Sequence, residues 1–183
     1  MRDSFSLLDE LERDLGSLSA EALDGKYRRF AVDTVGSEIA TAIALLPGPD
    51  DARALERGLH DALDRCARVG AVVVNVEYDL RREWAVWFFV CHEYSSPEEG
   101  DDSWAAEYAE ELRGPTLDDF AGLYQTHGAF DDSSRFGATL YLIARFCLTL
   151  RELVQVAPHP HIGVSLGYHK QDPIWRLREP DLR

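Results

Sequence analysis

The segment from Ala71 to Cys91, AVVVNVEYDLRREWAVWFFVC, decides the fold class. It contains two runs rich in β-branched and aromatic residues, AVVVNVEY (71–78) and WAVWFFVC (84–91), separated by DLRRE. Two such runs joined by a short polar segment predict a β-hairpin. Because both runs are almost continuously apolar, we expect central strands that are covered on both faces.

Helical patterns surround this hairpin. Apolar residues recur at three- and four-residue intervals, with capping residues before them, in segments 4–23, 50–70, 101–112, 116–128 and 135–154. This spacing places the apolar residues on one face of a helix. We therefore expect five helices, of which the last is the longest and forms the core.

Further strands are expected on both sides of the hairpin. Residues 27–35 and 38–46 predict two strands, although the alanine-rich SEIATAIALL in the second also fits a helix. The segment HIGVSLGYH (161–169) alternates apolar and small residues, which predicts a half-buried strand. The tail segment 174–179 extends the sheet. These elements predict a single α+β domain over residues 1–183, with a mostly antiparallel sheet of four to six strands flanked by helices.

Composition indicates a cytoplasmic protein that folds alone. The chain has 183 residues, of which 45% are hydrophobic, enough for one compact core. The N-terminus carries acids where a signal peptide needs a basic start, and no apolar run approaches the ~20 residues that cross a bilayer. The isolated cysteines Cys66, Cys91 and Cys147 predict buried, reduced thiols.

The negative charge is concentrated in the middle of the chain. The net charge is −14, and Glu83 to Ser134 holds thirteen acidic residues and one basic residue, Arg113. Such a field repels phosphate backbones and anionic membrane surfaces and attracts cationic partners. Direct binding of nucleic acid or of a membrane is therefore not expected.

The most acidic stretch is SSPEEGDDSWAAEYAEEL, from Ser95 to Leu112. Capping explains part of it, since Ser96, Pro97 and Glu99 fit a capping box and acids stabilise a helix N-terminus. The stretch is then either a solvated helix face or a surface for a basic partner. Ordinary surface helices intersperse Lys with Glu, and this one does not. The candidate partner-binding residues are Glu98, Glu99, Asp101, Asp102, Trp104, Glu107, Glu110 and Glu111.

Aromatic residues near these acids are candidate anchors for a partner. They are Trp84, Tyr94, Trp104 and Tyr108. Buried aromatic side chains supply much of the energy of many interfaces. Trp and Tyr at helical or strand spacing more often pack inward, so a core role is the competing interpretation.

The matches to catalytic and metal-binding motifs lack the surrounding sequence features that those motifs require. Gly163, Ser165 and Gly167 match G-x-S-x-G, but a nucleophile elbow needs a following helix and a downstream acid and histidine. Cys91, His92 and Glu93 are adjacent, and His159, His161 and His169 cluster near the end, all without the spacing of zinc ligands. The stretch EEGDDS lacks the calcium-loop pattern. We therefore expect no catalytic residue, metal or cofactor.

The segments EYD (77–79), EWAVWFFVCHEY (83–94) and DDSWAAEY (101–108) occur in an order that resembles small acidic immunity proteins encoded beside bacterial polymorphic toxins. The resemblance covers Val72 to Tyr124. It implies a cytosolic α+β inhibitor that binds one cognate toxin domain with a basic surface and occludes its active site.

Two other interpretations remain. One is a hydrolase with an unfamiliar site built from His92, Glu93 or the terminal histidines. The other is a structural or scaffold module, for example a homodimer formed through the aromatic strand.

Overall fold

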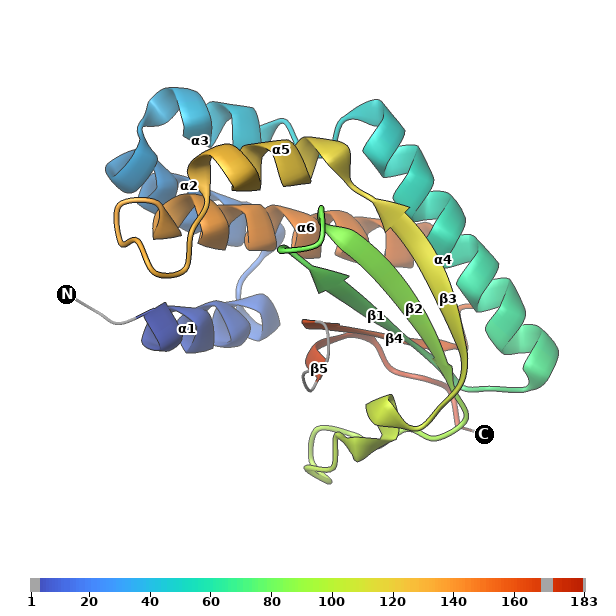
Figure 1. The fold of residues 1–183 in the computed structure, drawn as a ribbon. Coiled ribbons are helices and arrows are strands. Elements are labelled where there is room, and N and C mark those ends of the chain that lie inside the picture. The colour runs from blue at the N-terminus through green and yellow to red at the C-terminus, as the bar shows by residue number, and fades with distance from the viewer. Residues whose placement is uncertain (1–3, 169–172, 183) are drawn as a thin grey trace. The chain divides into compact units, whose positions relative to one another are not determined.

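The computed structural model describes residues 4–168 and 173–182 (Figure 1). Within these residues there are six α-helices and five strands in one mixed, mostly antiparallel sheet. The predicted α+β fold class and sheet type are confirmed. Two compact units make up the chain: one combines the residues up to Asp50 with Asp118–Leu150, and the other combines Asp51–Leu117 with the residues from Arg151 onward.

The first unit is helical. Its elements are α1 (Ser4–Ser17), α2 (Ala20–Val35), α3 (Ser37–Ala44), α5 (Asp118–His127) and the part of α6 (Phe136–Val156) up to Leu150. The predicted single helix over residues 4–23 is wrong at its end, because the Ser19 hydroxyl accepts a hydrogen bond of 3.2 Å from the Ala22 N–H. Ser19 is therefore the N-cap of a new helix.

The two strands predicted over residues 27–35 and 38–46 are wrong, since residues 27–35 lie in α2 and residues 38–44 lie in α3. The helix that SEIATAIALL also fits is the element that forms. Leu23, Tyr27 and Ala31 are buried at four-residue spacing while Gly25 and Arg29 between them are exposed, which fits a helix face because a strand would bury every second residue. Gly36, with φ of 89°, separates the helices, and its N–H donates to the Val32 carbonyl. It ends α2 and does not form a hairpin turn.

A polar cluster ties three segments of this unit together. Asp24 on α2 accepts hydrogen bonds from the Tyr141 hydroxyl at 2.9 Å and from Arg145 Nη1 at 3.2 Å, both on α6. Arg145 Nη2 also donates to the Leu46 carbonyl at 2.6 Å. Burial, and then the hydrogen bond to Asp24, raises the pKa of Tyr141, which keeps the hydroxyl protonated as a donor.

Replacing Asp24 by Ala should destabilise the protein by about 2–3 kcal/mol, because it removes two bonds to a charged acceptor and leaves Arg145 partly buried without its carboxylate. Urea denaturation measures the change. Asp33→Ala on the exposed face of the same helix is the control and should change the free energy of unfolding by less than about 0.5 kcal/mol. Equal losses for the two variants would contradict the role given to the cluster.

The second unit contains the sheet, with strand order β3-β2-β1-β4-β5. The strands are β1 (Val73–Asp79), β2 (Ala85–Cys91), β3 (Tyr108–Thr116), β4 (Gly163–Tyr168) and β5 (Pro173–Arg178). Strand β1 pairs antiparallel with β2, which confirms the predicted hairpin, and parallel with β4. The other neighbours are antiparallel.

Helix α4 (Pro49–Val69) lies against one face of this sheet. A Cβ built on Gly58 would approach Phe88 Cε2 to 2.8 Å, so helix and strand are in close contact there. The apolar stripe predicted for this helix is buried, and Cys66 Sγ lies 3.8 Å from the Val73 carbonyl oxygen. The helix predicted over residues 50–70 is confirmed.

Strand β4 is not half-buried as expected, because its first five residues are all buried. Pro180 covers Gly163, and the Ser165 hydroxyl donates to Asn75 Oδ1 at 2.8 Å on the neighbouring strand. Small residues on one face therefore reflect close packing and not exposure to water. His169, in the predicted strand 161–169, lies outside the described residues.

The three cysteines are free and buried, as expected. Burial raises the pKa of Cys66 to about 12 and that of Cys91 to about 12, and it also raises the pKa of Cys147. The thiolate is the reactive form of cysteine. At pH 8 a disulfide reagent should therefore modify none of the three in the native protein within minutes and all three after unfolding in guanidinium. Rapid labelling of the native protein would contradict this.

Candidate functional site: an anionic loop on the sheet

The loop between β2 and β3, residues 92–107, folds over the face of the sheet opposite α4. Phe88 points toward α4, so its neighbour Phe89 points to the other face, where it packs with Trp104 of the loop. The helix predicted over residues 101–112 is wrong. This segment is a short 3₁₀ helix, Ser103–Ala106, followed by β3.

The reason for this error is tertiary pairing. The sequence WAAEYAEEL contains good helix formers at helical spacing, but its backbone pairs with β2, placing Glu111 opposite Phe89 and Leu112 opposite Phe88. Helix propensity is a weak preference that sheet pairing and burial override. Of the side chains expected on the helix, Trp104 and Ala105 are buried and Tyr108 is exposed.

Trp104 fixes the loop to the sheet. Only 3% of its surface is exposed, and it packs with Val73, Phe89 and Cys91. The ring of Tyr94 lies 5.2 Å from its ring, and the Arg176 guanidinium lies 5.9 Å from its ring centre. These contacts make a small core beneath the acidic loop.

Two ion pairs within the second unit hold acidic residues in place. Asp102 is bound by Arg176 of β5, and Arg65 of α4 donates from Nε and Nη2 to the two carboxylate oxygens of Glu110. The hydrogen bond from Arg65 lowers the pKa of Glu110. Both carboxylates therefore carry charges that are already neutralised locally.

Local hydrogen bonds shape the turn at residues 96–101. Glu99 accepts from the Ser96 N–H at 2.7 Å and the Ser95 hydroxyl at 3.0 Å, which is the glutamate half of the predicted capping box without a following helix. The hydrogen bond from the Ser96 backbone lowers the pKa of Glu99, and hydrogen bonds from Ser103 lower that of Asp101. Both groups stay ionised at neutral pH, and the bonds are lost as the pH falls through the lowered pKa values.

The loop surrounds an anionic hollow of about 380 Å³. Four carboxylates line it together with two aromatic and two serine side chains: Glu93, Glu99, Asp101, Glu107, Tyr94, Trp104, Ser95 and Ser103. Four negative charges around one small concave site create a strong negative potential. The structure therefore brings acids that are fourteen residues apart in sequence to one place.

The predicted partner-binding residues occupy four different settings. Glu98, Glu107 and Glu111 are exposed, and within the described residues no Lys or Arg pairs with them. Glu99 and Asp101 line the hollow, whereas Asp102 and Glu110 are held in ion pairs and Trp104 is buried. The sequence analysis did not include Glu93 among the partner-binding residues. Glu93 does lie in the segment from Glu83 to Leu112, which contains no Lys or Arg.

The residues considered for hydrolysis lie in unfavourable settings. Ser165 is fully buried on β4, which confirms that its G-x-S-x-G match is not a nucleophile elbow. His159 Nε2 lies 2.8 Å from Asp64 Oδ1, while His92 and Glu93 are exposed. Across residues 4–168 and 173–182, no group of three or more His, Cys, Asp or Glu side chains could hold a metal ion.

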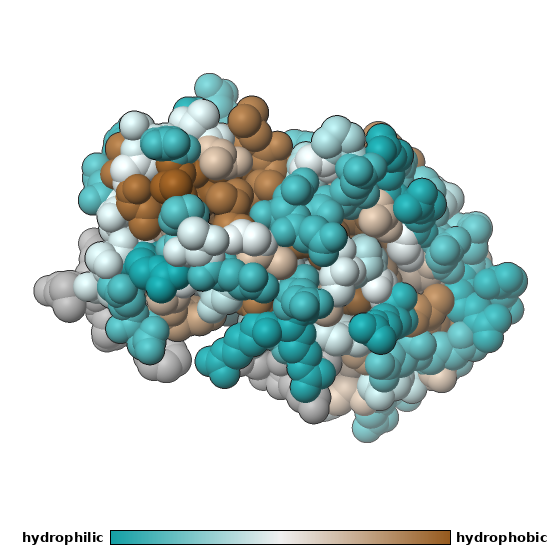
Figure 2. Space-filling view, turned by 45° about the horizontal axis from the view of Figure 1, so that its top comes forward, coloured by the Kyte–Doolittle hydropathy of each residue, from teal (hydrophilic) through white to brown (hydrophobic). Residues whose placement is uncertain are grey.

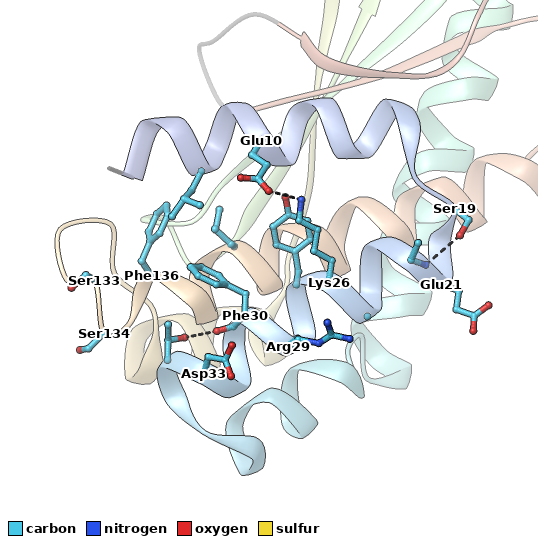
Figure 3. Close-up of a pocket in the computed structure, with 16 residues that line it drawn as sticks. Glu10, Ser19, Glu21, Lys26, Arg29, Phe30, Asp33, Ser133, Ser134 and Phe136 are labelled. Atoms are coloured by element: carbon cyan, nitrogen blue, oxygen red, sulfur yellow. Dashed lines mark hydrogen bonds and ion pairs between the residues drawn. The ribbon is translucent and has the colours of Figure 1, made fainter. Parts of the chain in front are cut away.

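The first unit has a larger groove, of about 1130 Å³, lined by α1, α2, α6 and the segment before α6 (Figure 3). Lys26 lies in it, bound to Glu10 at 2.6 Å and to Asp14 at 2.5 Å. Burial alone would lower the pKa of Lys26, but the hydrogen bonds to these carboxylates outweigh it and raise the pKa. Lys26 is thus a protonated structural cation and a poor nucleophile.

An apolar patch occurs on the face shown in Figure 2, over the region of α3. Leu45, directly after α3, is 76% exposed, and Val32 of α2 is 38% exposed. Exposed apolar groups can contribute to an interface.

Comparison of the chain with protein-family models, curated proteins and solved structures gave no match. Within the described residues no helix is both long and apolar enough to cross a membrane.

Proposed function

We propose that this protein is a binding protein of the immunity type, which inhibits a cognate toxin domain by docking its anionic loop onto a basic surface of that domain. The observation that carries the proposal is the hollow in which Glu93, Glu99, Asp101 and Glu107 converge beside Tyr94 and Trp104. A toxin that acts on nucleic acids or nucleotides needs a basic cleft, and an anionic surface complements such a cleft.

The loop suits rapid and specific binding because it is fixed before the partner arrives. Trp104 is buried, the turn is hydrogen-bonded, and Arg176 holds Asp102. A preorganised surface loses little conformational entropy on binding. Glu98 and Glu111 are exposed and add to the negative charge of the loop and of β3, which would steer a cationic partner toward the hollow.

A tagged copy expressed in its native cell tests this function directly. We expect it to retain a basic protein, encoded by a neighbouring reading frame, whose toxic activity is lost on complex formation. The basic protein should not be retained by a variant that combines Glu93→Gln, Glu99→Gln, Asp101→Asn and Glu107→Gln. It should still be retained by a control variant in which the same number of acidic side chains is neutralised on α4 and α6. Retention of the toxin by the loop variant would refute the role of the hollow.

A homodimer formed through the aromatic strand has little structural support. Strand β2 is paired with β1 on one side and with β3 on the other. A second copy therefore cannot pair with β2 along its edges.

A further inference from the structure

We propose that the partner engages this protein by adding an extended, basic segment as an additional strand along the outer edge of β3. This inference rests on the proposed function and specifies the mode of binding. Strand β3 is at one end of the sheet, and in the described part of the chain it pairs with β2 alone (Figure 1). An edge strand presents unpaired N–H and C=O groups that can pair with another chain.

No residue of β3 is buried. All nine residues of β3 are exposed or half-buried, whereas all seven residues of β1 are buried. Tyr108, at the start of β3, is 45% exposed and its ring is supported by Phe89 at 4.8 Å. A supported, exposed tyrosine next to an open edge can pack against a side chain of an added strand.

The usable part of the edge is acidic. Pro115 has no N–H, so regular pairing is restricted to Tyr108–Arg113. This part carries the exposed Glu111, and Glu107 precedes it at the rim of the anionic hollow, whereas Glu110 is already paired with Arg65 and Arg113 ends the part. Lys or Arg side chains of an added strand would lie opposite Glu111 or beside Glu107, which favours a basic segment.

Charge also disfavours a second copy of this chain as the occupant. Each copy carries a net charge of −14, so two copies brought together at this edge would repel each other. A heterologous basic strand therefore fits this edge better than self-pairing.

Amide hydrogen exchange measured by NMR tests this proposal with synthetic peptides as probes. One peptide alternates lysine with valine, and the control peptide has glutamate in place of lysine. The lysine peptide should slow exchange of outward-facing amides in Tyr108–Arg113 by about tenfold or more at saturation, because they gain hydrogen bonds. The glutamate peptide should not bind.

Charge variants provide a matched comparison. Glu107→Gln with Glu111→Gln should weaken binding of the lysine peptide by about three- to tenfold, because it removes one charge opposite the added strand and one beside its start. Asp61→Asn with Glu152→Gln, on the exposed faces of α4 and α6, should leave it unchanged. Equal weakening by both pairs, or binding of the lysine peptide without slower exchange in β3, would overturn the proposal.

Two further outcomes separate this inference from the proposed function. If the captured toxin protects residues 93–107 but no amide of β3, strand addition is refuted and the inhibitory function stands. If no basic protein is captured and the lysine peptide does not bind, both fail. The protein could also sediment as a dimer, with the β3 amides protected from hydrogen exchange when no peptide is added. That result would assign the edge to a second copy and overturn the proposal.

Discussion

Trp104→Ala should lower the free energy of unfolding by about 3–5 kcal/mol, the usual cost of truncating a buried tryptophan. Trp104 is 3% exposed and packs with Val73, Phe89 and Cys91. Its indole Nε1–H is buried and has no hydrogen-bond partner among the residues that the structure describes, so the loss comes from packing. Because Trp104 fixes the loop, the variant should also bind the toxin more weakly.

Chemical denaturation measures the first effect, with Tyr108→Ala as the control. Tyr108 is also aromatic and close to the loop, but it is 45% exposed, and its truncation should cost about 1 kcal/mol or less. Trp104→Phe should retain most of the stability, because an aromatic ring still fills much of the site and the unpaired N–H is removed. A loss for Trp104→Ala no greater than that for Tyr108→Ala would show that the loop is not anchored by this residue.

Replacing Glu98, Glu107 and Glu111 by Gln should slow association with the toxin by about 10- to 100-fold at low ionic strength, with a smaller effect on dissociation. These three carboxylates are exposed, and within the described residues no Lys or Arg neutralises them. The substitution keeps the size of the side chains, so folding should be unaffected. Stopped-flow fluorescence of the complex measures the rate.

The control removes the same number of charges elsewhere in the second unit, through Glu56→Gln, Asp61→Asn and Glu152→Gln. Because steering depends on where charge lies and not only on its total, this variant should slow association by less than about threefold. Similar rates for the two triple variants would mean that net charge alone governs the encounter.

The sequence predicted the elements whose local signals agree with their surroundings. The β1–β2 hairpin follows from two runs of β-branched and aromatic residues, and α4, α5 and α6 follow from caps and apolar stripes. The errors arose where a helical and a strand pattern are both compatible with the residues. Tyr27–Val35 forms helix because Leu23, Tyr27 and Ala31 bury one face, and Tyr108–Leu112 forms strand because β2 offers it a pairing edge.

Part of the candidate site was predictable because it left a local signal in the sequence. A stretch without positive charge indicated a negative surface, and the exposed Glu98, Glu107 and Glu111 are within it. The ion pairs Arg65–Glu110 and Arg176–Asp102 join residues 45 and 74 positions apart. A local sequence pattern cannot predict these ion pairs or the parallel pairing of β1 with β4. Such contacts form only when segments that are distant in the sequence fold together.

The dependence of the association rate on salt tests the central claim most directly, namely that the anionic loop recognises a basic partner. With the purified toxin and the unmodified protein, the rate constant should fall by about tenfold or more when the ionic strength rises from about 0.02 M to about 0.5 M, because screening removes the steering field. The dissociation rate should change much less. An association rate that is independent of salt would contradict the claim.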